Sequence, residues 1–355
     1  MSTNIISFII VLSILIFFHE LGHFLIARLF EVGVEKFSLG FGPKLLGKKI
    51  GITDYRISLI PLGGYIKMVG EEPDSQIDPA DIPISFSHKH VFKRILIVAA
   101  GPIFNLLLAV IIFFGIFQIS GTFILKPSIG KIEEGTPAHR EGLKENDLIV
   151  AIDGSPVSSW DEMAETIISS RGKTLKLSVL RGEATFEINI TPELKTTRNI
   201  FGEDIKRYMI GIAASGNVFI KELNPFQAFG ESIAQTYNIT KLTLITVGKL
   251  IQGKISAKTL GGPIMIAQMA GQQAKQGATN LLFFIALISI NLAILNFLPI
   301  PVLDGGHLLF FFIEAIIRRP VNTKMREIAQ QAGIFILILL MIFVFYNDIT
   351  RVFFR

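Results

Sequence analysis

Two histidines and a glutamate lie inside an apolar segment near the start of the chain, in the sequence LIFFHELGHFLI at residues 15–26. His19 and His23 are four residues apart, so on a helix they share one face, and Glu20 lies about 100° around the axis from His19. This is the His-Glu-x-x-His pattern, in which two imidazoles bind zinc and the glutamate takes a proton from water. Because ionisable residues inside an apolar segment are costly, the pattern favours a metal site over two histidines that only hydrogen-bond between helices.

A zinc site with two histidines needs a third protein ligand, and the apolar run at residues 281–317 supplies a candidate. The run is too long for one straight span, and irregular backbone at membrane depth occurs only where protein buries it or where it lines a wet cavity. Four helix-breaking residues lie at its centre: Pro299, Pro301, Gly305 and Gly306. We expect Asp304, within this break, to complete the site, with His307 as a rival ligand and helix capping as the alternative role of Asp304. The chain contains no cysteine, so histidines and carboxylates are the expected ligands.

Two asparagines in apolar segments are further candidates. Asn105 lies ten residues beyond Ile95 and His19 lies nine residues before Arg28, so both lie roughly 14–15 Å from the same membrane boundary. We expect Asn105 to line the same cavity as His19 or, alternatively, to form a hydrogen bond between helices. Asn296 directly precedes the broken stretch. Three other histidines fall in expected loops and are expected to be solvated: His88, His90 and His139.

The composition indicates a membrane protein. Only 18% of the residues are charged, against about 25% in soluble domains, and 50% are hydrophobic. The net charge of +5 is modest and the basic residues form no long tract, so nucleic acid is not an expected partner.

Four runs are long enough to span about 30 Å of hydrocarbon: 5–30, 95–117, 281–317 and 332–349. The first has no preceding basic residue and no small-residue cleavage site, so we interpret it as a retained span. Residues 238–251 contain two lysines and predict an amphipathic helix on a surface.

The distribution of Lys and Arg predicts the orientation in the membrane. Ten of these residues lie from Arg28 to Arg94, and four lie in residues 318–326. Short loops rich in basic residues face the cytoplasm, so both loops are expected there. Both chain termini and the region 118–280 are then expected on the outer side.

The two long connections are expected to contain strands. Between the first two spans, alternating runs such as residues 56–60 are separated by Gly-Pro and Gly-Gly pairs, which predicts a β-hairpin. This hairpin either caps the helices or offers an edge that accepts an extended peptide strand. Residues 118–195 predict one mixed α+β domain with helices near 137–141 and 160–170. Residues 196–280 are expected to form a linker with amphipathic helices.

Three motifs together resemble those of a known family. His-Glu-Leu-Gly-His in the first span, Gly-Pro-x-x-Asn in the second and Asn-x-x-Pro-x-Pro-x-Leu-Asp-Gly-Gly in the third are similar to motifs of the site-2 protease family of intramembrane zinc metalloproteases. The stretch GTPAHREGLKENDLIVAIDGSPV resembles a PDZ domain. The order of elements is similar to that of the bacterial regulator-of-sigma-E proteases over nearly the whole chain. Those proteases have two PDZ domains, whereas this sequence shows one.

The resemblance implies an intramembrane endopeptidase that cleaves transmembrane segments of single-span membrane proteins, such as anti-sigma factors or remnant signal peptides. It implies Zn²⁺ as cofactor, with His19, His23 and Asp304 as ligands and Glu20 as the catalytic base. Substrate contacts are expected from four further residues: Asn296, Asn105, Pro299 and Pro301. One alternative is a zinc-binding membrane transporter or sensor, but transporters usually have repeated halves and none are visible in this sequence. The other alternative is an inactive PDZ-bearing scaffold, but the expected zinc ligands and base are all present.

The expected fold is a membrane α-helical bundle of four transmembrane helices with a cytoplasmic-side β-hairpin or sheet and one extracytoplasmic PDZ-like α+β domain. Four segments are expected: helices and hairpin at 1–117, the PDZ-like domain at 118–195, linker and amphipathic helices at 196–280, and the last two helices at 281–355. The expected location is the bacterial cytoplasmic (inner) membrane, with the lipid bilayer and single-span substrates as partners. The oligomeric state is left open.

Overall fold

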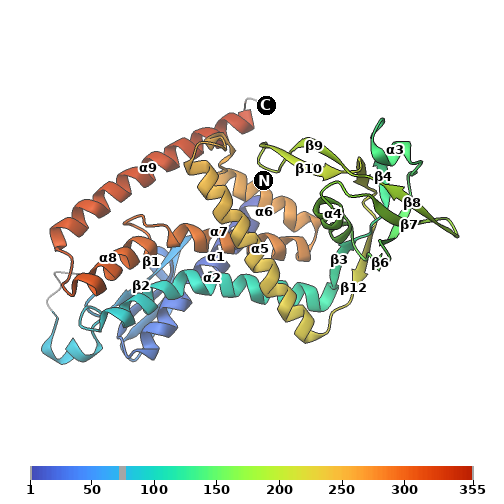
Figure 1. Cartoon of the computed structure of the whole chain (residues 1–355). Helices are drawn as coiled ribbons and strands as arrows, with labels where there is room; N and C mark the ends of the chain where they lie inside the picture. The colour runs from blue at the N-terminus through green and yellow to red at the C-terminus, as the bar shows by residue number, and fades with distance from the viewer. Residues whose placement is uncertain (1, 72–76, 354–355) are drawn as a thin grey trace. The chain divides into compact units, whose positions relative to one another are not determined.

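The structure, a computed structural model, describes residues 2–71 and 77–353 and divides into two compact units (Figure 1). The first unit combines Met1–Ile116 with Phe229–Arg355 and contains the long helices. The second unit, Phe117–Ala228, contains most of the short strands.

Four helices of the first unit are long and apolar enough to cross a membrane. They correspond to the four predicted spans: α1 (Ser2–Leu29), α2 (Val91–Ser120), α7 (Ala278–Phe297) and α9 (Thr323–Phe353). The shortest, α7, has 20 residues, about the length that spans a bilayer core. The predicted break after α7 is also present, because the chain leaves the helix at Phe297 and resumes with α8 (Asp304–Ile317). The protein is therefore a membrane helical protein.

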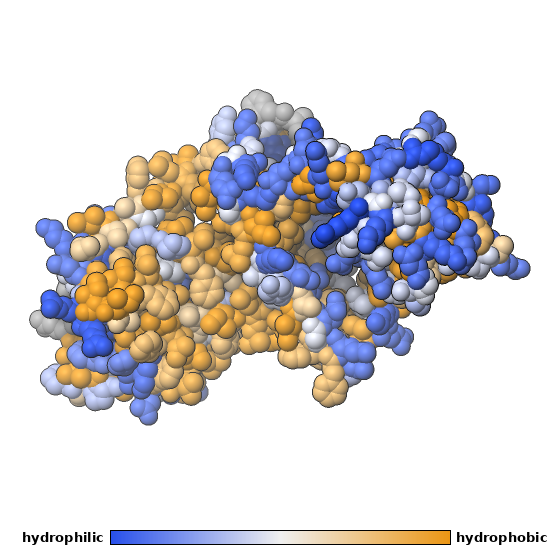
Figure 2. Space-filling model, viewed as in Figure 1, coloured by the Kyte–Doolittle hydropathy of each residue, from blue (hydrophilic) through white to orange (hydrophobic). Residues whose placement is uncertain are grey.

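Three of the long helices, α1, α2 and α7, pack around one apolar cluster. Val11 and Leu15 of α1, Leu108 of α2 and Phe284 of α7 are buried together with Ala270 of α6 (Pro263–Gln276). Much of the face of this unit that Figure 2 shows is apolar (orange), and α9 exposes a series of large hydrophobic side chains. An apolar surface of this extent is unusual for a soluble monomer and fits contact with lipid.

Asp348 joins α9 to the start of α6. Its carboxylate accepts hydrogen bonds from the backbone N–H groups of Gly262, Ile264 and Met265, at 2.9, 3.0 and 3.1 Å. The first N–H groups of a helix have no partner within the helix, so a carboxylate placed there both satisfies them and complements the helix dipole. The remaining helix, α5 (Pro225–Ile251), is amphipathic and is not among the candidate spans found in the described residues.

The connection between α1 and α2 folds as the predicted hairpin, β1 (Val34–Ile50) and β2 (Thr53–Met68). Phe37 of β1 lies opposite Ile66 and also opposite Tyr55, so the first half of β1 lies between two segments of β2. The second of these segments, residues 64–68, pairs on one side only within the described chain. It is therefore an edge strand, and one of its N–H groups, that of Met68, donates to the Glu71 carboxylate at 3.0 Å. The connection ends in a short 3₁₀ helix at Pro79–Ile84.

The second unit is a mixed α+β domain around its own core. One antiparallel sheet has the order β6-β5-β7-β8, and two helices accompany it, α3 (Pro137–Arg140) and α4 (Trp160–Ser169), close to their predicted positions. The strands of this sheet are β5 (Leu148–Ile152), β6 (Ser155–Pro156), β7 (Leu175–Arg181) and β8 (Ala184–Ile190). Ile149, Leu177 and Val179 of the sheet pack with Met163 of α4 in a closed apolar cluster.

The compact unit extends to Ala228, beyond the boundary expected at residue 195. Six short strands form three antiparallel pairs: β3 (Thr122–Leu125) with β12 (Val218–Lys221), β4 (Ile129–Ile132) with β11 (Ile212–Ala214), and β9 (Glu193–Arg198) with β10 (Asp204–Met209). The outermost pair joins Thr122 to Lys221, which closes the unit on itself. Part of the segment expected to be a linker is thus an integral part of this domain.

A buried ion pair stabilises the second unit. The Asp147 carboxylate is fully buried and accepts hydrogen bonds from Arg181 Nε at 2.7 Å, from Arg181 Nη2 at 2.8 Å and from the Lys144 N–H at 2.8 Å. Burial alone would raise the pKa of this carboxyl group, but the hydrogen bonds and the Arg181 charge outweigh burial and hold the pKa below its usual value. The carboxylate therefore stays ionised at neutral pH.

Candidate active site

Three candidate metal-binding side chains meet although 281 residues separate the second from the third in the sequence. His19 and His23 project from α1, and Asp304 is the first residue of α8. The His19 Nε2 atom lies 3.2 Å from Asp304 Oδ2 and the His23 Nε2 atom lies 3.6 Å from Asp304 Oδ1. The two Nε2 atoms are 3.3 Å apart. Two imidazole nitrogens and a carboxylate that converge in this way could hold a metal ion.

The orientation of His23 is fixed by the second helix. Its Nδ1 atom lies 2.9 Å from the backbone carbonyl oxygen of Ile97 in α2. A carbonyl can only accept, so Nδ1 carries the proton and Nε2 keeps a free lone pair directed at Asp304. This is the tautomer that a metal ligand requires.

Close backbone packing at the break positions Asp304. A Cβ atom on Gly305 would lie 2.2 Å from the Leu298 carbonyl oxygen, and one on Gly306 would lie 2.4 Å from the Ile300 carbonyl oxygen, so only glycine allows the chain to fold back this tightly. The N-cap of α8 is Leu303, so Asp304 does not have the capping role considered as its alternative, and its carboxylate instead lies beside the histidines. Among the described residues, the buried Oδ2 atom of Asp304 has no well-oriented hydrogen-bond partner. A buried carboxylate oxygen that lacks a hydrogen-bond partner is suited to bind a metal ion.

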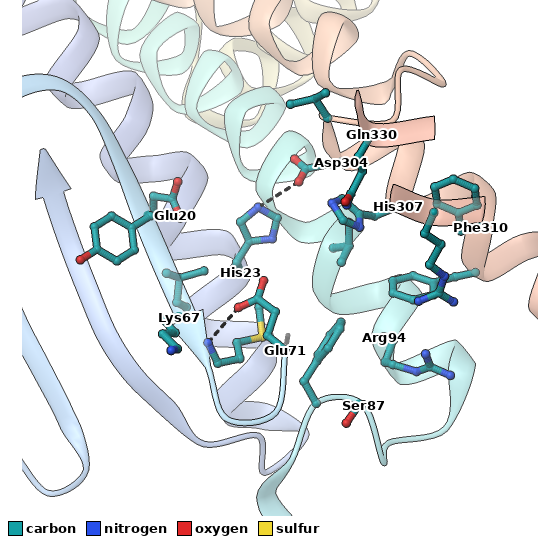
Figure 3. Close-up of a pocket in the computed structure, with 18 of the residues that line it drawn as sticks. Glu20, His23, Lys67, Glu71, Ser87, Arg94, Asp304, His307, Phe310 and Gln330 are labelled. Carbon is teal, nitrogen blue, oxygen red and sulfur yellow. Dashed lines mark hydrogen bonds and ion pairs between the residues drawn. The ribbon is translucent and has the colours of Figure 1, made fainter. Parts of the chain in front are cut away.

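Glu20 lies in the same cavity as the three candidate ligands but does not belong to their cluster. Its side chain passes the edge strand at Gly64, where an added Cβ atom would approach Glu20 Cγ to 3.3 Å. Figure 3 shows His23 and Asp304 directed toward one another, with Glu20 close by. The arrangement can therefore offer a metal site and a separate carboxylate that is able to accept a proton.

The cavity, of about 640 Å³, reaches from this cluster to the ends of α8 and α9. One wall is the edge strand, residues 65–68 of β2. Arg94 and Arg326 lie at the far end, where both pair with Glu314, and Phe311 packs beneath Arg94. The site is thus connected to a charged, wettable region.

The other predicted residues lie in several different places. His307 lines the cavity but is outside the metal cluster. Asn105 is fully buried, which does not favour contact with substrate, and its Nδ2 atom lies 3.3 Å from His19 Nδ1. Asn296 Nδ2 lies 3.5 Å from both ring nitrogens of His19. Pro299 and Pro301 shape the break but are not among the residues that line the cavity. Three further histidines are exposed, as predicted: His88, His90 and His139. His139, however, lies in α3 and not in a loop.

Sequence reasoning missed Gly101 of α2. A Cβ atom at this position would lie 2.3 Å from His23 Nε2 and 2.8 Å from His19 Cε1, so the absence of a side chain makes room for both imidazoles. The four-residue spacing of Ile97, Gly101 and Asn105 places all three on one face of α2 and could have revealed that this face meets the histidines.

An apolar helical bundle that gathers two histidines, an aspartate and a nearby glutamate around one cavity has the features of a membrane metalloenzyme. The family model described as peptidase family M50 matches residues 7–340. Relatives described as "Putative zinc metalloprotease" include one of Campylobacter jejuni, 38% identical with 99% of this chain and 94% of the relative covered, and one of Rickettsia conorii, 38% identical with 99% of each covered. A third, of Mesorhizobium japonicum, is 34% identical, with 98% of each covered.

The chain belongs to peptidase family M50, the site-2 protease family. It is a zinc metalloprotease of the membrane, as the sequence motifs predicted. The transporter, sensor and inactive-scaffold alternatives are not supported.

Proposed function

We propose that this protein is an intramembrane endopeptidase that hydrolyses a peptide bond within or near the membrane-spanning segment of single-span proteins. His19, His23 and Asp304 hold the zinc ion, and Glu20 is the catalytic base. The observation that carries the proposal is the convergence of these side chains in one cavity between apolar helices, with an edge strand as one wall.

The zinc ion, when bound, supplies a Lewis acid that polarises the scissile carbonyl and makes a water molecule more acidic. The Glu20 carboxylate takes the proton of the attacking water and delivers it to the leaving amine. The Ile97 carbonyl keeps the Nε2 atom of His23 available, and the glycines of the break hold Asp304 in reach of both histidines. The surrounding apolar helices limit the access of bulk water, and the charged end of the cavity supplies a path for it.

A substrate helix must unwind before cleavage, because its scissile bonds are enclosed in its own hydrogen bonding. The edge strand at residues 64–68 can pair with an extended segment, and Asn296 can hydrogen-bond its backbone. At 3.5 Å from either His19 nitrogen, the Asn296 amide makes only a weak contact there and remains able to bind a peptide. Contacts of Pro299 and Pro301 with substrate stay a prediction.

Gly101→Ala is expected to weaken zinc binding by roughly 10–100-fold, the loss typical when the support of a metal ligand is disturbed. The new methyl group would overlap His23 Nε2, whose ring the Ile97 carbonyl holds in place. Gly115→Ala is the matched control, because it lies on the same helix and an added Cβ there meets nothing within 4 Å. Chelator competition measures both affinities, and wild-type affinity in Gly101→Ala would show that the histidines do not bind zinc as proposed.

The protein is proposed to lie in the bacterial cytoplasmic membrane with both termini and the second unit outside. The basic loops that follow α1 and α8 support this orientation. Because the chain has no cysteine, single cysteines report it cleanly. In intact cells, Ser155→Cys is expected to react with an impermeant thiol reagent and Asp81→Cys is not; both positions are exposed. The opposite labelling pattern would reverse the orientation.

The second unit is proposed to be a PDZ-like domain that meets the outer part of the substrate. A groove of about 180 Å³ runs between α4 and the segment 207–212, lined by Met163, Ile167 and Ile210 among others. The groove either binds a peptide strand or excludes substrates whose outer domain has not yet been removed, as in regulated intramembrane proteolysis of anti-sigma factors or remnant signal peptides.

The proposed function is tested with purified protein in detergent and a reporter that carries one transmembrane segment. We expect zinc-loaded protein to cut the reporter, chelator-treated protein to leave it intact, and restored zinc to restore cleavage. Mass spectrometry of the products is expected to locate the cut within or beside the apolar segment. Cleavage confined to distant soluble parts of the reporter would contradict an intramembrane protease.

A further inference from the structure

We propose that Asn105 is a positioning residue for His19: its side-chain oxygen accepts the proton on Nδ1 and thereby directs Nε2 at the metal. The inference rests on the proposed zinc site and adds a residue from α2 to it.

The geometry of the cluster decides which nitrogen each histidine uses. The Nε2 atoms of His19 and His23 lie 3.3 Å apart, and both are directed at Asp304. A histidine that binds metal through Nε2 carries its proton on Nδ1, and that proton normally meets a carbonyl or carboxylate oxygen. His23 has the Ile97 carbonyl for this purpose. His19 needs an equivalent acceptor.

Two amides approach Nδ1 of His19 within the described chain, and they differ in how firmly they are held. Asn105 is fully buried, and the Ser289 hydroxyl of α7 donates to its backbone carbonyl oxygen at 2.7 Å. Asn296 is only partly buried and lies equally far from both ring nitrogens, so it is aligned with neither. Asn105 is therefore the amide that can fix the ring.

The amide of Asn105 offers either of two groups to the ring. Its nitrogen beside Nδ1 suits the tautomer with the proton on Nε2, whereas metal binding through Nε2 requires the oxygen there. A 180° rotation of the amide exchanges the two groups, and in the orientation described the Oδ1 atom is buried without a hydrogen-bond partner among the described residues. Binding of metal and an amide oxygen at Nδ1 thus favour one another.

The test compares zinc affinity and the histidine spectrum of full-length variants in detergent. Asn105→Leu keeps the approximate size but has no acceptor, and its zinc affinity is expected to fall roughly 10–100-fold. Asn105→Asp keeps an acceptor oxygen and is expected to stay within about tenfold of wild type, since carboxylates commonly support metal-binding histidines. With ¹⁵N-labelled histidine and zinc present, the His19 Nδ1–H signal should shift in Asn105→Leu, while the His23 signal stays in place.

Two controls separate this role from simple packing. Ser289→Ala removes the contact to the Asn105 backbone but leaves the amide, and Asn296→Leu removes the other amide; both are expected to bind zinc within about threefold of wild type. Unchanged affinity in Asn105→Leu, or equal weakening in Asn296→Leu, would overturn this inference and leave the proposed zinc site standing. A wild-type protein that binds no zinc would overturn the proposed function together with it.

Discussion

Glu20→Gln is expected to retain stoichiometric zinc and to lose essentially all cleavage of a transmembrane reporter. The substitution keeps the size of the side chain but replaces a proton acceptor by an amide that cannot take the proton of the attacking water. General-base catalysis contributes roughly 10²–10⁴-fold, and in a water-poor site no solvent base substitutes for it. Zinc is expected to remain because Glu20 lies outside the metal cluster.

The matched control is Glu327→Gln, an exposed carboxylate that lines the far end of the same cavity. It changes the charge of the cavity equally and is expected to leave cleavage near the wild-type rate. Metal analysis and reporter cleavage on folded protein measure the outcome. Full cleavage by Glu20→Gln would refute the assignment of the base, and loss of zinc together with activity would make Glu20 a ligand or a structural residue.

Asp304→Asn is expected to lose both zinc and cleavage. The carboxylate supplies the only negative charge in the cluster of candidate ligands, and in a low-dielectric site an ion without that compensation is expensive to bind. We expect zinc affinity to fall by more than the roughly 10–100-fold that follows loss of an outer supporting group. His307→Ala, which alters the same cavity outside the cluster, is expected to keep zinc largely bound.

The competing role of Asp304 is to stabilise the start of α8. Asp304 lies in the first turn and is not the N-cap, so this role predicts a folding defect of only roughly 0.3–1 kcal/mol, from the helix dipole, with metal retained. Thermal unfolding and metal content of detergent-solubilised variants distinguish the two roles. Stoichiometric zinc in Asp304→Asn with depletion in His307→Ala would show that the third ligand is His307.

Features that depend on local pattern could be predicted from the sequence. The four apolar runs, the break around Pro299 and Pro301, and the pairing of His19 with His23 on one helix face all follow from composition and helical period. The convergence of Asp304 with these histidines was expected from the need for a third ligand, and the family membership supports a zinc site. The geometry of this three-residue cluster depends on contacts between helices, which no local sequence pattern specifies.

Features that depend on distant pairing could not be predicted. β11 and β12 have 3 and 4 residues, too few for a clear alternation, and their partners lie about 80–100 residues earlier in the chain. Local pattern therefore gave no sign that the compact unit continues past residue 195 to Ala228. Depth along the helix placed Asn105 and His19 at one level and left open a shared cavity or a hydrogen bond between helices. Only the structure shows that Asn105 is enclosed, is not among the residues that line the cavity, and lies beside the imidazole.

Zinc K-edge X-ray absorption on the wild-type, full-length protein tests whether His19, His23 and Asp304 together hold one zinc ion, because the spectrum reports the number of imidazole ligands. We expect one zinc per chain with two imidazole ligands and oxygen ligands. The spectrum is expected to be unchanged in His307→Ala and lost in Asp304→Asn. Three imidazole ligands in the wild type, reduced to two in His307→Ala, would contradict this set of ligands.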